Sequence, residues 1–553
     1  MRREKRKALF LCLFFILSFS GLAFSQEQRI LPKEVFELLV NEISGEEALG
    51  AVMDLSGRPR IRPREEYLGT FYEAKLILER ARKYRLESTK IEYFPWKYPC
   101  WEPIEAELWL VEPIKEKLTG LDLIQLCLIE NSKNADVKAE IIDVGEGTHP
   151  DDYQGKDVRG KIVLCHGDER LVNAQAVHER GALGIISYRS SYPDDYADMV
   201  SWGVFLQPLY ESEENYTFGF MISPRQGRRL QRLLREHKKI AVEARVKSRL
   251  HPGKLDVINT VIPGTGRPNE EIMLMAHLFE YYYKQGANDN ASGSAAILEA
   301  ARVIAKLVNE GKLPPPRRSL RFFWEPEGWG TYAWLAKYPD AARRIKAVID
   351  MDMVGESHKK CGSIFHLLDT PDSLPHFFND VVKHFAEYLG RRSGLGRRIA
   401  LESSAELIAS PTGSRDPFYH QLTHFNPRTY NENWLSIPHL LFHCSPDPYY
   451  HSSEDLPDKC DPTQLKRAAL LGAAAALFMA NFEEKDIPLL SSMVLSSAEE
   501  RSAKDKTKAV ALLSGSTKES LHGGYKEALN IVRQGHLREE RALASIGEYL
   551  LLP

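Results

Sequence analysis

The segment 275–302, MAHLFEYYYKQGANDNASGSAAILEAAR, runs from the end of an apolar stretch through a glycine-containing turn into a strongly helical pattern. His277 ends the run EIMLMAH, and Asp289 stands in the turn GANDNASG just before the helix. In an open α/β sheet, ligands gather at the carboxyl ends of the strands. A histidine and an aspartate on the two sides of this turn therefore predict a ligand site at a sheet edge.

Short apolar strands alternate with helical patterns on both sides of this segment. LDVINTVIPG, SLRFFWEPE, AVIDMDMVG and HLLFHC (439–444) have the continuous apolar character of strands that are buried on both faces. Helices are expected at about 374–390 and, in an Ala/Leu-rich stretch, at 462–482. The pattern predicts an α/β fold with a mixed, mainly parallel sheet between layers of helices.

Further candidate ligands follow the other strands. Glu325 and Glu327 come after LRFFW, Asp352 ends AVIDMD, and His451 follows HLLFHC by a few residues. Singly, each has an ordinary explanation, such as helix capping for Asp289. Those explanations do not predict two imidazoles and several carboxylates at one sheet edge with no cysteine among them.

This donor set suits a pair of zinc ions. One carboxylate can bridge two metals, and each metal then takes one imidazole and one more carboxylate. Two such metals activate a water molecule and polarise a carbonyl group. A further carboxylate must accept the proton of that water. The sequence thus predicts a dinuclear hydrolytic centre.

The motifs come in the order of a known family: His277, the GANDNASG turn with Asp289, the acidic segment after a strand, DMDMVG with Asp352, and YYHSSEDLPDKCDP with His451. Over roughly 27–130 and 250–482, the chain resembles the co-catalytic zinc aminopeptidases of the clan that includes glutamate carboxypeptidase and the transferrin receptor. The turn and the YYH segment together are fairly specific, whereas either alone is weak. The resemblance implies the zinc aminopeptidase fold and two zinc ions per chain.

The resemblance also assigns roles. Asp289 would be the bridging carboxylate, and His277 and Asp352 would be ligands of opposite metals. His451 would be the last imidazole and Glu327 the last carboxylate. Asp447 lies four residues before His451 and would orient its imidazole without binding a metal itself.

Two departures from the family pattern affect these roles. The family usually has His-x-Asp, but this chain has His277-Leu278-Phe279, so only Glu280 could support the imidazole, and only if the backbone turned differently. The family commonly has adjacent glutamates as base and ligand, where this chain has Glu325-Pro326-Glu327. We assign Glu327 as the ligand and Glu325 as the catalytic base; an alignment without a gap would make Glu325 the ligand.

Residues 131–249 resemble a protease-associated (PA) domain, through GKDVRGKIVLCHGD and AVHERGALGIISY. In this family that module is often inserted in the peptidase, where it helps to shape the substrate cleft. The predicted domains are therefore a peptidase domain in two parts (26–130 and 250–482), the PA insert, and a helical C-terminal tail (483–553).

The N-terminus has a basic start, an apolar run and a small-x-small cleavage pattern. Residues 1–25 are predicted to be a signal peptide, so the protein is expected to be exported to the periplasm or the extracellular space. The alternative is an uncleaved anchor. No other membrane segment is expected. The net charge of −3 argues against a nucleic acid partner.

The sequence therefore predicts an exported metallo-aminopeptidase that removes N-terminal residues from peptides with di-zinc-activated water. A catalytically impaired binding protein, a carboxypeptidase or a cyclase on the same fold are the alternatives. The residue preference, the oligomeric state and the disulfide pattern stay open, because six mature cysteines allow 15 connectivities.

Overall fold

The computed structural model describes residues 30–205, 217–237, 239–278, 285–393, 408–423 and 437–551 of the 553-residue chain. The chain divides into two compact units, Leu39–Asn481 and the combination of Met1–Leu38 with Phe482–Pro553. The predicted signal peptide and Glu280 lie outside the described residues.

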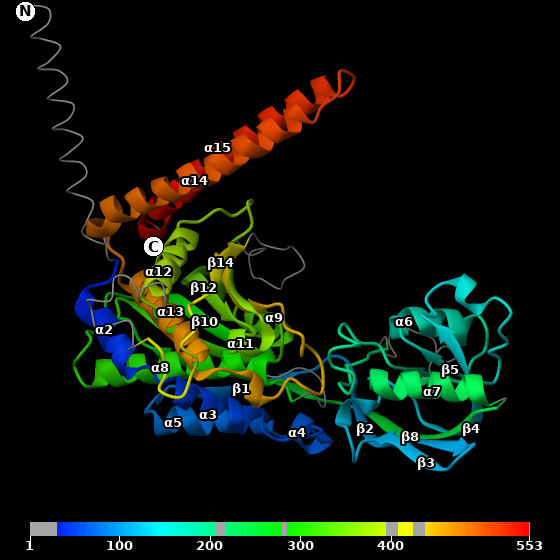
Figure 1. Ribbon diagram of the computed structural model, residues 1–553. Coiled ribbons are helices and arrows are strands. Elements are labelled where there is room, and N and C mark those ends of the chain that lie inside the picture. The colour runs from blue at the N-terminus through cyan, green and yellow to red at the C-terminus, as the bar shows by residue number, and fades with distance from the viewer. Residues whose placement is uncertain are drawn as a thin grey trace, which may run out of the picture. The chain divides into compact units, whose positions relative to one another are not determined.

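The larger unit contains, among its described residues, an eight-stranded sheet with the order β1-β9-β11-β10-β12-β15-β13-β14 (Figure 1). Its strands are β1 (Lys90–Pro95), β9 (Lys254–Ile262), β10 (Arg267–His277), β11 (Arg318–Glu325), β12 (Ile345–Met351), β13 (Ile364–Leu368), β14 (His420–Thr423) and β15 (His439–Ser445). The central strands β11, β10, β12 and β15 run parallel, whereas β9 and β13 pair antiparallel with their central neighbours. The predicted mixed α/β class is confirmed.

Helices accompany this sheet along the chain. They are α2 (Lys33–Glu42), α3 (Gly45–Ser56), α4 (Arg64–Leu68), α5 (Tyr72–Lys83), α8 (Gly293–Asn309), α9 (Trp329–Lys337), α10 (Ala341–Arg344), α11 (His358–Cys361), α12 (Phe378–Ser393) and α13 (Pro462–Asn481). Helices α8 and α13 pack on β10 and β12. A Cβ atom at Gly472 of α13 would lie 2.1 Å from Cε of Met351, so glycine there lets the helix approach the sheet closely.

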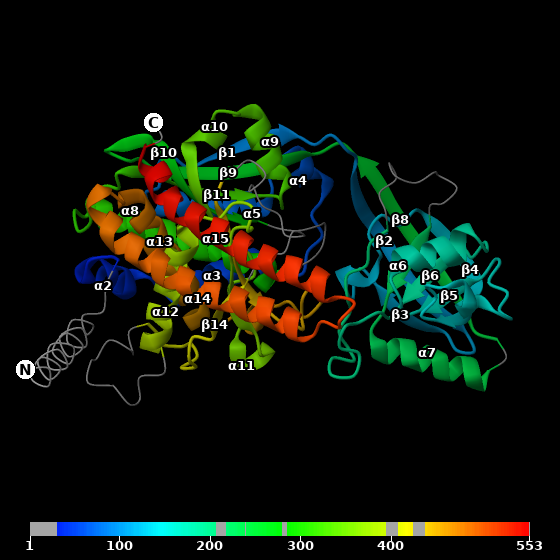
Figure 2. The same ribbon diagram turned by 90° about the horizontal axis from the view of Figure 1, so that it is seen from above.

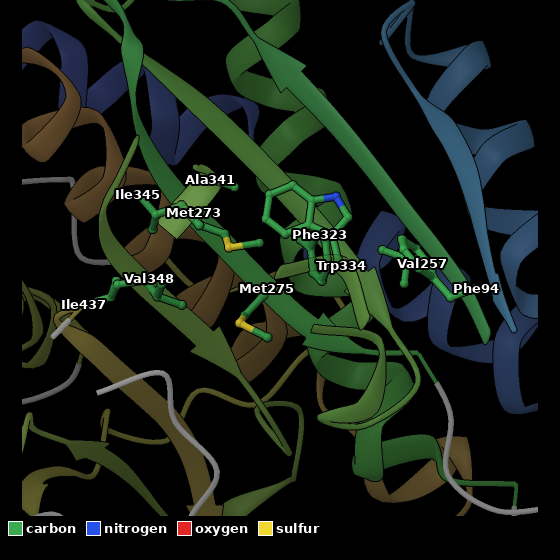
Figure 3. Close-up of a cluster of buried hydrophobic side chains, with 10 residues drawn as sticks. All are labelled: Phe94, Val257, Met273, Met275, Phe323, Trp334, Ala341, Ile345, Val348 and Ile437. Atoms are coloured by element: carbon green, nitrogen blue, oxygen red, sulfur yellow. The ribbon is translucent and has the colours of Figure 1, made fainter. Parts of the chain in front are cut away.

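A cluster of buried apolar side chains lies around β10, β11 and β12 (Figure 3). The cluster consists of Phe94, Val257, Met273, Met275, Phe323, Trp334, Ala341, Ile345, Val348 and Ile437. Met273 and Met275 are two residues apart on one strand, so they share a face. Trp334 packs its ring edge against Phe323, with centroids 5.3 Å apart. Residues 271–277 are all buried, which explains their continuous apolar sequence.

A seven-stranded sheet forms the core of the insert, which we define as Cys100–His251. Its order is β3-β2-β8-β4-β5-β6-β7. The elements are β2 (Cys100–Glu112), β3 (Glu116–Gly120), β4 (Ala135–Gly145), β5 (Ile162–Cys165), α6 (Glu169–Val172), β6 (Gly184–Ser187), β7 (Phe218–Met221), α7 (Pro224–Glu236) and β8 (Ala241–His251). Strands β4 to β7 are parallel, and Figure 1 shows α6 and α7 beside them.

The insert begins earlier than the sequence indicates. We expected it at residue 131, but β2 pairs with β8 along its whole length, from Cys100 opposite His251 to Glu112 opposite Ala241. The seven-stranded sheet thus includes β2, which lies before the predicted boundary, and the domain boundaries themselves stay predictions. Local alternation identifies a strand, but it does not reveal which sheet the strand joins.

The C-terminal residues form a helical hairpin of α14 (Ile487–Ser514) and α15 (Leu521–Leu551), which lie side by side in Figures 1 and 2. Arg501 pairs with Glu539 across the hairpin, with Nη2 2.6 Å from Oε2. In the described part of the chain, no single helix is long and apolar enough to span a membrane; Pro462–Asn481 and Glu484–Ser514 meet that test only as a pair.

The described cysteines form no disulfide. All six are free thiols, and five of them are buried. Burial raises the pKa of Cys127 to about 12. Apolar packing therefore holds both sheets together without cross-links among the described residues.

Candidate metal centre

Three of the predicted site residues stand at the ends of adjacent parallel strands. His277 is the last residue of β10 and lies opposite Glu325, the last residue of β11. Asp352 follows the end of β12, and its backbone N–H donates to the carbonyl of Phe442 on β15 at 3.0 Å. Parallel pairing brings these chain-distant positions to one edge, as the sequence predicts.

His277, Asp289 and Asp352 form a compact group. Nε2 of His277 is 3.1 Å from Oδ1 of Asp289 and 3.2 Å from Oδ1 of Asp352. One ligand atom from each residue lies within 4.8 Å of the others, as holding a single metal ion requires. Burial alone would lower the pKa of His277, but the carboxylates of Asp352, Asp289 and Glu327 raise it well above its usual value. The imidazole thus sits where positive charge is favoured.

The second oxygen of Asp289 points to the other predicted imidazole. Its Oδ2 atom is 3.1 Å from Nε2 of His451. One buried carboxylate therefore faces a histidine on each side, which is the arrangement of a ligand that bridges two cations. The nitrogen and oxygen donors fit zinc.

These distances bear on one expectation from the resemblance. His277 and Asp352 were expected on opposite metals. Two ligand atoms on one tetrahedral zinc ion lie about 3.3 Å apart, which matches the 3.2 Å between Nε2 of His277 and Oδ1 of Asp352. These atoms, together with Asp289, are therefore close enough to hold one ion, and the assignment of each ligand to a metal stays a prediction.

The turn that carries Asp289 is held by Asp455, which the sequence analysis missed. The backbone N–H groups of Asn288 and Asp289 donate to the two carboxylate oxygens of Asp455, at 2.6 and 3.1 Å. Asp455 is 1% exposed. Its only signal in the sequence was its position four residues after His451, in YYHSSEDLPDK.

Two glycines allow the backbone conformation and the close packing of this turn. Gly286 opens it with φ of 67°, in the left-handed region. A Cβ atom at Gly293 would lie 1.8 Å from the carbonyl oxygen of Met351, so a larger residue would force α8 away from β12. Asn290 ties the same elements together, because its Nδ2 donates to that carbonyl at 2.8 Å.

The two glutamates after β11 differ in their surroundings. The carboxylate of Glu325 is buried and accepts the backbone N–H groups of Gly328 at 2.7 Å and Thr331 at 3.1 Å. It therefore stabilises the start of α9. Glu327 is half-buried, and its charge acts on His277. Their roles as base and ligand stay predictions.

The support of the two imidazoles by Glu280 and Asp447 also stays a prediction. Nδ1 of His277 is buried and has no hydrogen-bond partner among the described residues, consistent with the loss of the usual His-x-Asp acid. Asp447 accepts from Nδ2 of Asn288 at 2.9 Å and from the N–H of Tyr449 at 2.7 Å. It thus connects the Asp289 turn to the His451 loop, whereas its action on His451 itself is untested.

Parts of this chain are similar in sequence to known protein families and proteins. Residues 256–476 match the model of peptidase family M28, and residues 85–363 match a domain of unknown function, DUF4910. Leucine aminopeptidase 1 of Ajellomyces capsulatus is 34% identical over 131 residues, covering 21% of this chain and 32% of that protein. Carboxypeptidase Q of Xenopus laevis is 25% identical over 380 residues, covering 64% and 77%.

The fold has solved counterparts. The structure of BSAP, a zinc aminopeptidase from Bacillus subtilis, superposes with a TM-score of 0.55 at 19% identity, covering 80% of this chain and 97% of that one. This likeness shows the fold. The chain spans about a third of the length of the leucine aminopeptidases that it matches.

Proposed function

We propose that the chain, which belongs to family DUF4910 through residues 85–363 and matches the model of peptidase family M28 over residues 256–476, is a zinc-dependent aminopeptidase with two metal positions. The observation that carries the proposal is the placement of Asp289 between His277 and His451, with a carboxylate oxygen 3.1 Å from Nε2 of each. Export through residues 1–25 is part of the proposal.

The donor set defines what each residue would do. His277 and Asp352 would hold one zinc ion, His451 and Glu327 the other, and Asp289 would contact both. When bound, zinc supplies Lewis-acid polarisation of a peptide carbonyl and lowers the pKa of water. The buried Asp455 keeps the Asp289 turn in place through two backbone hydrogen bonds.

Proton transfer is assigned to Glu325. Its carboxylate is fixed by Gly328 and Thr331 and lies across the strand register from His277. A fixed carboxylate at this edge is suited to accept the proton of the attacking water and to pass it to the leaving amine. The partner in this reaction is a peptide with a free N-terminus.

The test is metal analysis of the purified chain together with hydrolysis of a panel of aminoacyl-anilides. We expect about two zinc ions per chain and cleavage that a chelator abolishes. Bound zinc without cleavage of any substrate would favour the alternative of a binding protein on the same scaffold, and absence of zinc binding would contradict the proposal.

A carboxypeptidase is the second candidate, and the long alignment with Carboxypeptidase Q favours it. Dipeptides with a blocked amino group and dipeptides with an amidated carboxyl group separate the two. An aminopeptidase cleaves only the amidated series, because it requires the free amino group. A carboxypeptidase cleaves only the blocked series.

A further inference from the structure

The insert reaches the loop that carries His451. Ser201 and Ser452 form an antiparallel β-bridge. The N–H of Trp202 donates to the carbonyl of His451 at 2.7 Å, and the N–H of Ser453 donates to the carbonyl of Val200 at 2.9 Å. The backbone on both sides of the predicted metal ligand is therefore fixed by a segment from outside the eight-stranded sheet.

Side chains reinforce this backbone contact. The indole of Trp202 meets the imidazole of His451 edge to face, with ring centroids 5.2 Å apart and an interplanar angle of 85°. Tyr196 of the insert packs against Tyr449, two residues before His451, with ring centroids 5.0 Å apart. The side-chain hydroxyl of Ser453 also accepts the N–H of Val200, at 3.1 Å.

Trp202 is itself held firmly within the insert. Its Nε1 donates to Oε2 of Glu130 at 3.1 Å, and its carbonyl accepts from Nη2 of Arg189 at 3.1 Å. Nε of Arg189 in turn donates to the buried carboxylate of Glu169 at 2.9 Å. Hydrogen bonds on the ring nitrogen and on the backbone carbonyl therefore fix the position of the indole within the insert.

The backbone of His451 needs such a support. Its φ is 53°, in the left-handed region, which is unfavourable for a residue other than glycine. The backbone hydrogen bond from Trp202 and its ring contact hold His451 in this conformation.

We propose that Trp202 of the insert is a positioning residue for His451, so that the insert completes one of the two metal positions. The proposal rests on the proposed function in one respect, that His451 ligates a metal. The other position, with His277 and Asp352, lies on strand ends of the sheet and does not depend on Trp202.

Zinc titration of the metal-free full chain tests this, with the number of sites and each dissociation constant measured by competition with a chromophoric chelator. Trp202→Ala is expected to weaken one site by about tenfold or more, within the 10–100-fold range of outer-shell changes, and to leave the other unchanged. Trp202→Phe keeps a ring and should weaken the same site less. Ser453→Ala tests the contact from the other side of the loop.

Trp109→Ala is the matched control, because this tryptophan of the insert also donates its indole N–H to a glutamate, Glu107, at 3.1 Å. It should leave both sites unchanged. Two unaltered sites in Trp202→Ala and Ser453→Ala would overturn the inference while the proposed function stands. The inference would also be overturned if Trp202→Ala and the control Trp109→Ala each weakened both sites to the same extent. A wild-type chain that binds no zinc would overturn both proposals.

Discussion

The two histidines that face Asp289 are held in different ways. His277 ends a central strand that pairs with parallel neighbours on both sides, and its side chain is 5% exposed. His451 lies on a loop, has a left-handed backbone conformation and a side chain that is 17% exposed, and is contacted by the insert. Sheet hydrogen bonds fix the first imidazole, whereas tertiary contacts fix the second. The His451 side should therefore be the more easily disturbed half of the centre.

Asp289→Asn should have the largest effect, because it alters both halves at once. Loss of the bridging charge is expected to remove both zinc ions and to lower kcat/KM by ~10⁴-fold or more. Zinc content and anilide hydrolysis measure the outcome. A variant that kept two zinc ions and near-normal activity would show that Asp289 is not the bridge.

Glu325→Gln and Glu327→Gln separate the catalytic base from the metal ligand. Removing the base should lower kcat by ~10²–10³-fold with zinc content unchanged. Removing a ligand should lower zinc content itself. We expect the first result for Glu325 and the second for Glu327. The reverse result would exchange their roles and support the alignment without a gap.

Asp455→Ala should disturb both halves moderately, because it leaves two buried backbone N–H groups of the Asp289 turn without an acceptor. We expect a loss of ~2–4 kcal/mol in the free energy of unfolding and about 10–100-fold weaker zinc binding at both sites. Asp458→Ala, at an exposed acid of the same segment, is the control. Weakening of only one site would contradict the placement of Asp455 under the bridge.

Glu356→Gln should have the smallest effect. Glu356 is 1% exposed, and burial together with the charge of Asp447 raises its pKa from 4.5 to about 10. The folded chain then keeps a proton that the unfolded chain releases above about pH 4.5, so this acid lowers stability progressively as pH rises toward 10.

The glutamine variant lacks that penalty and should be ~1–3 kcal/mol more stable than the wild type at about pH 8, with no difference near pH 4.5. Urea unfolding at both pH values measures this. A stability difference that does not change with pH would show that Glu356 is ionised in the folded chain, and that no buried neutral acid lies beside Asp447.

Local features of the fold were predictable from the sequence. The helix predicted at 462–482 is α13, Pro462–Asn481, because an Ala/Leu-rich pattern is a local signal. The segment TYAWLAKYPDAARRI (331–345) has a helical pattern interrupted by Pro339, and it forms the two helices α9 and α10 with a break around that proline. Proline has no backbone N–H and disfavours helical geometry in the residue before it.

The sequence by itself determined which kinds of side chain end the strands, since apolar runs, turn glycines and the His, Asp and Glu types at their ends are properties of short segments. Only the tertiary structure decided that β2 joins the insert, that His277 and Asp352 lie 3.2 Å apart, that Asp455 supports the turn, and that Trp202 contacts His451. These relations depend on strand order and on contacts between residues far apart in the chain, and neither periodicity nor spacing encodes them.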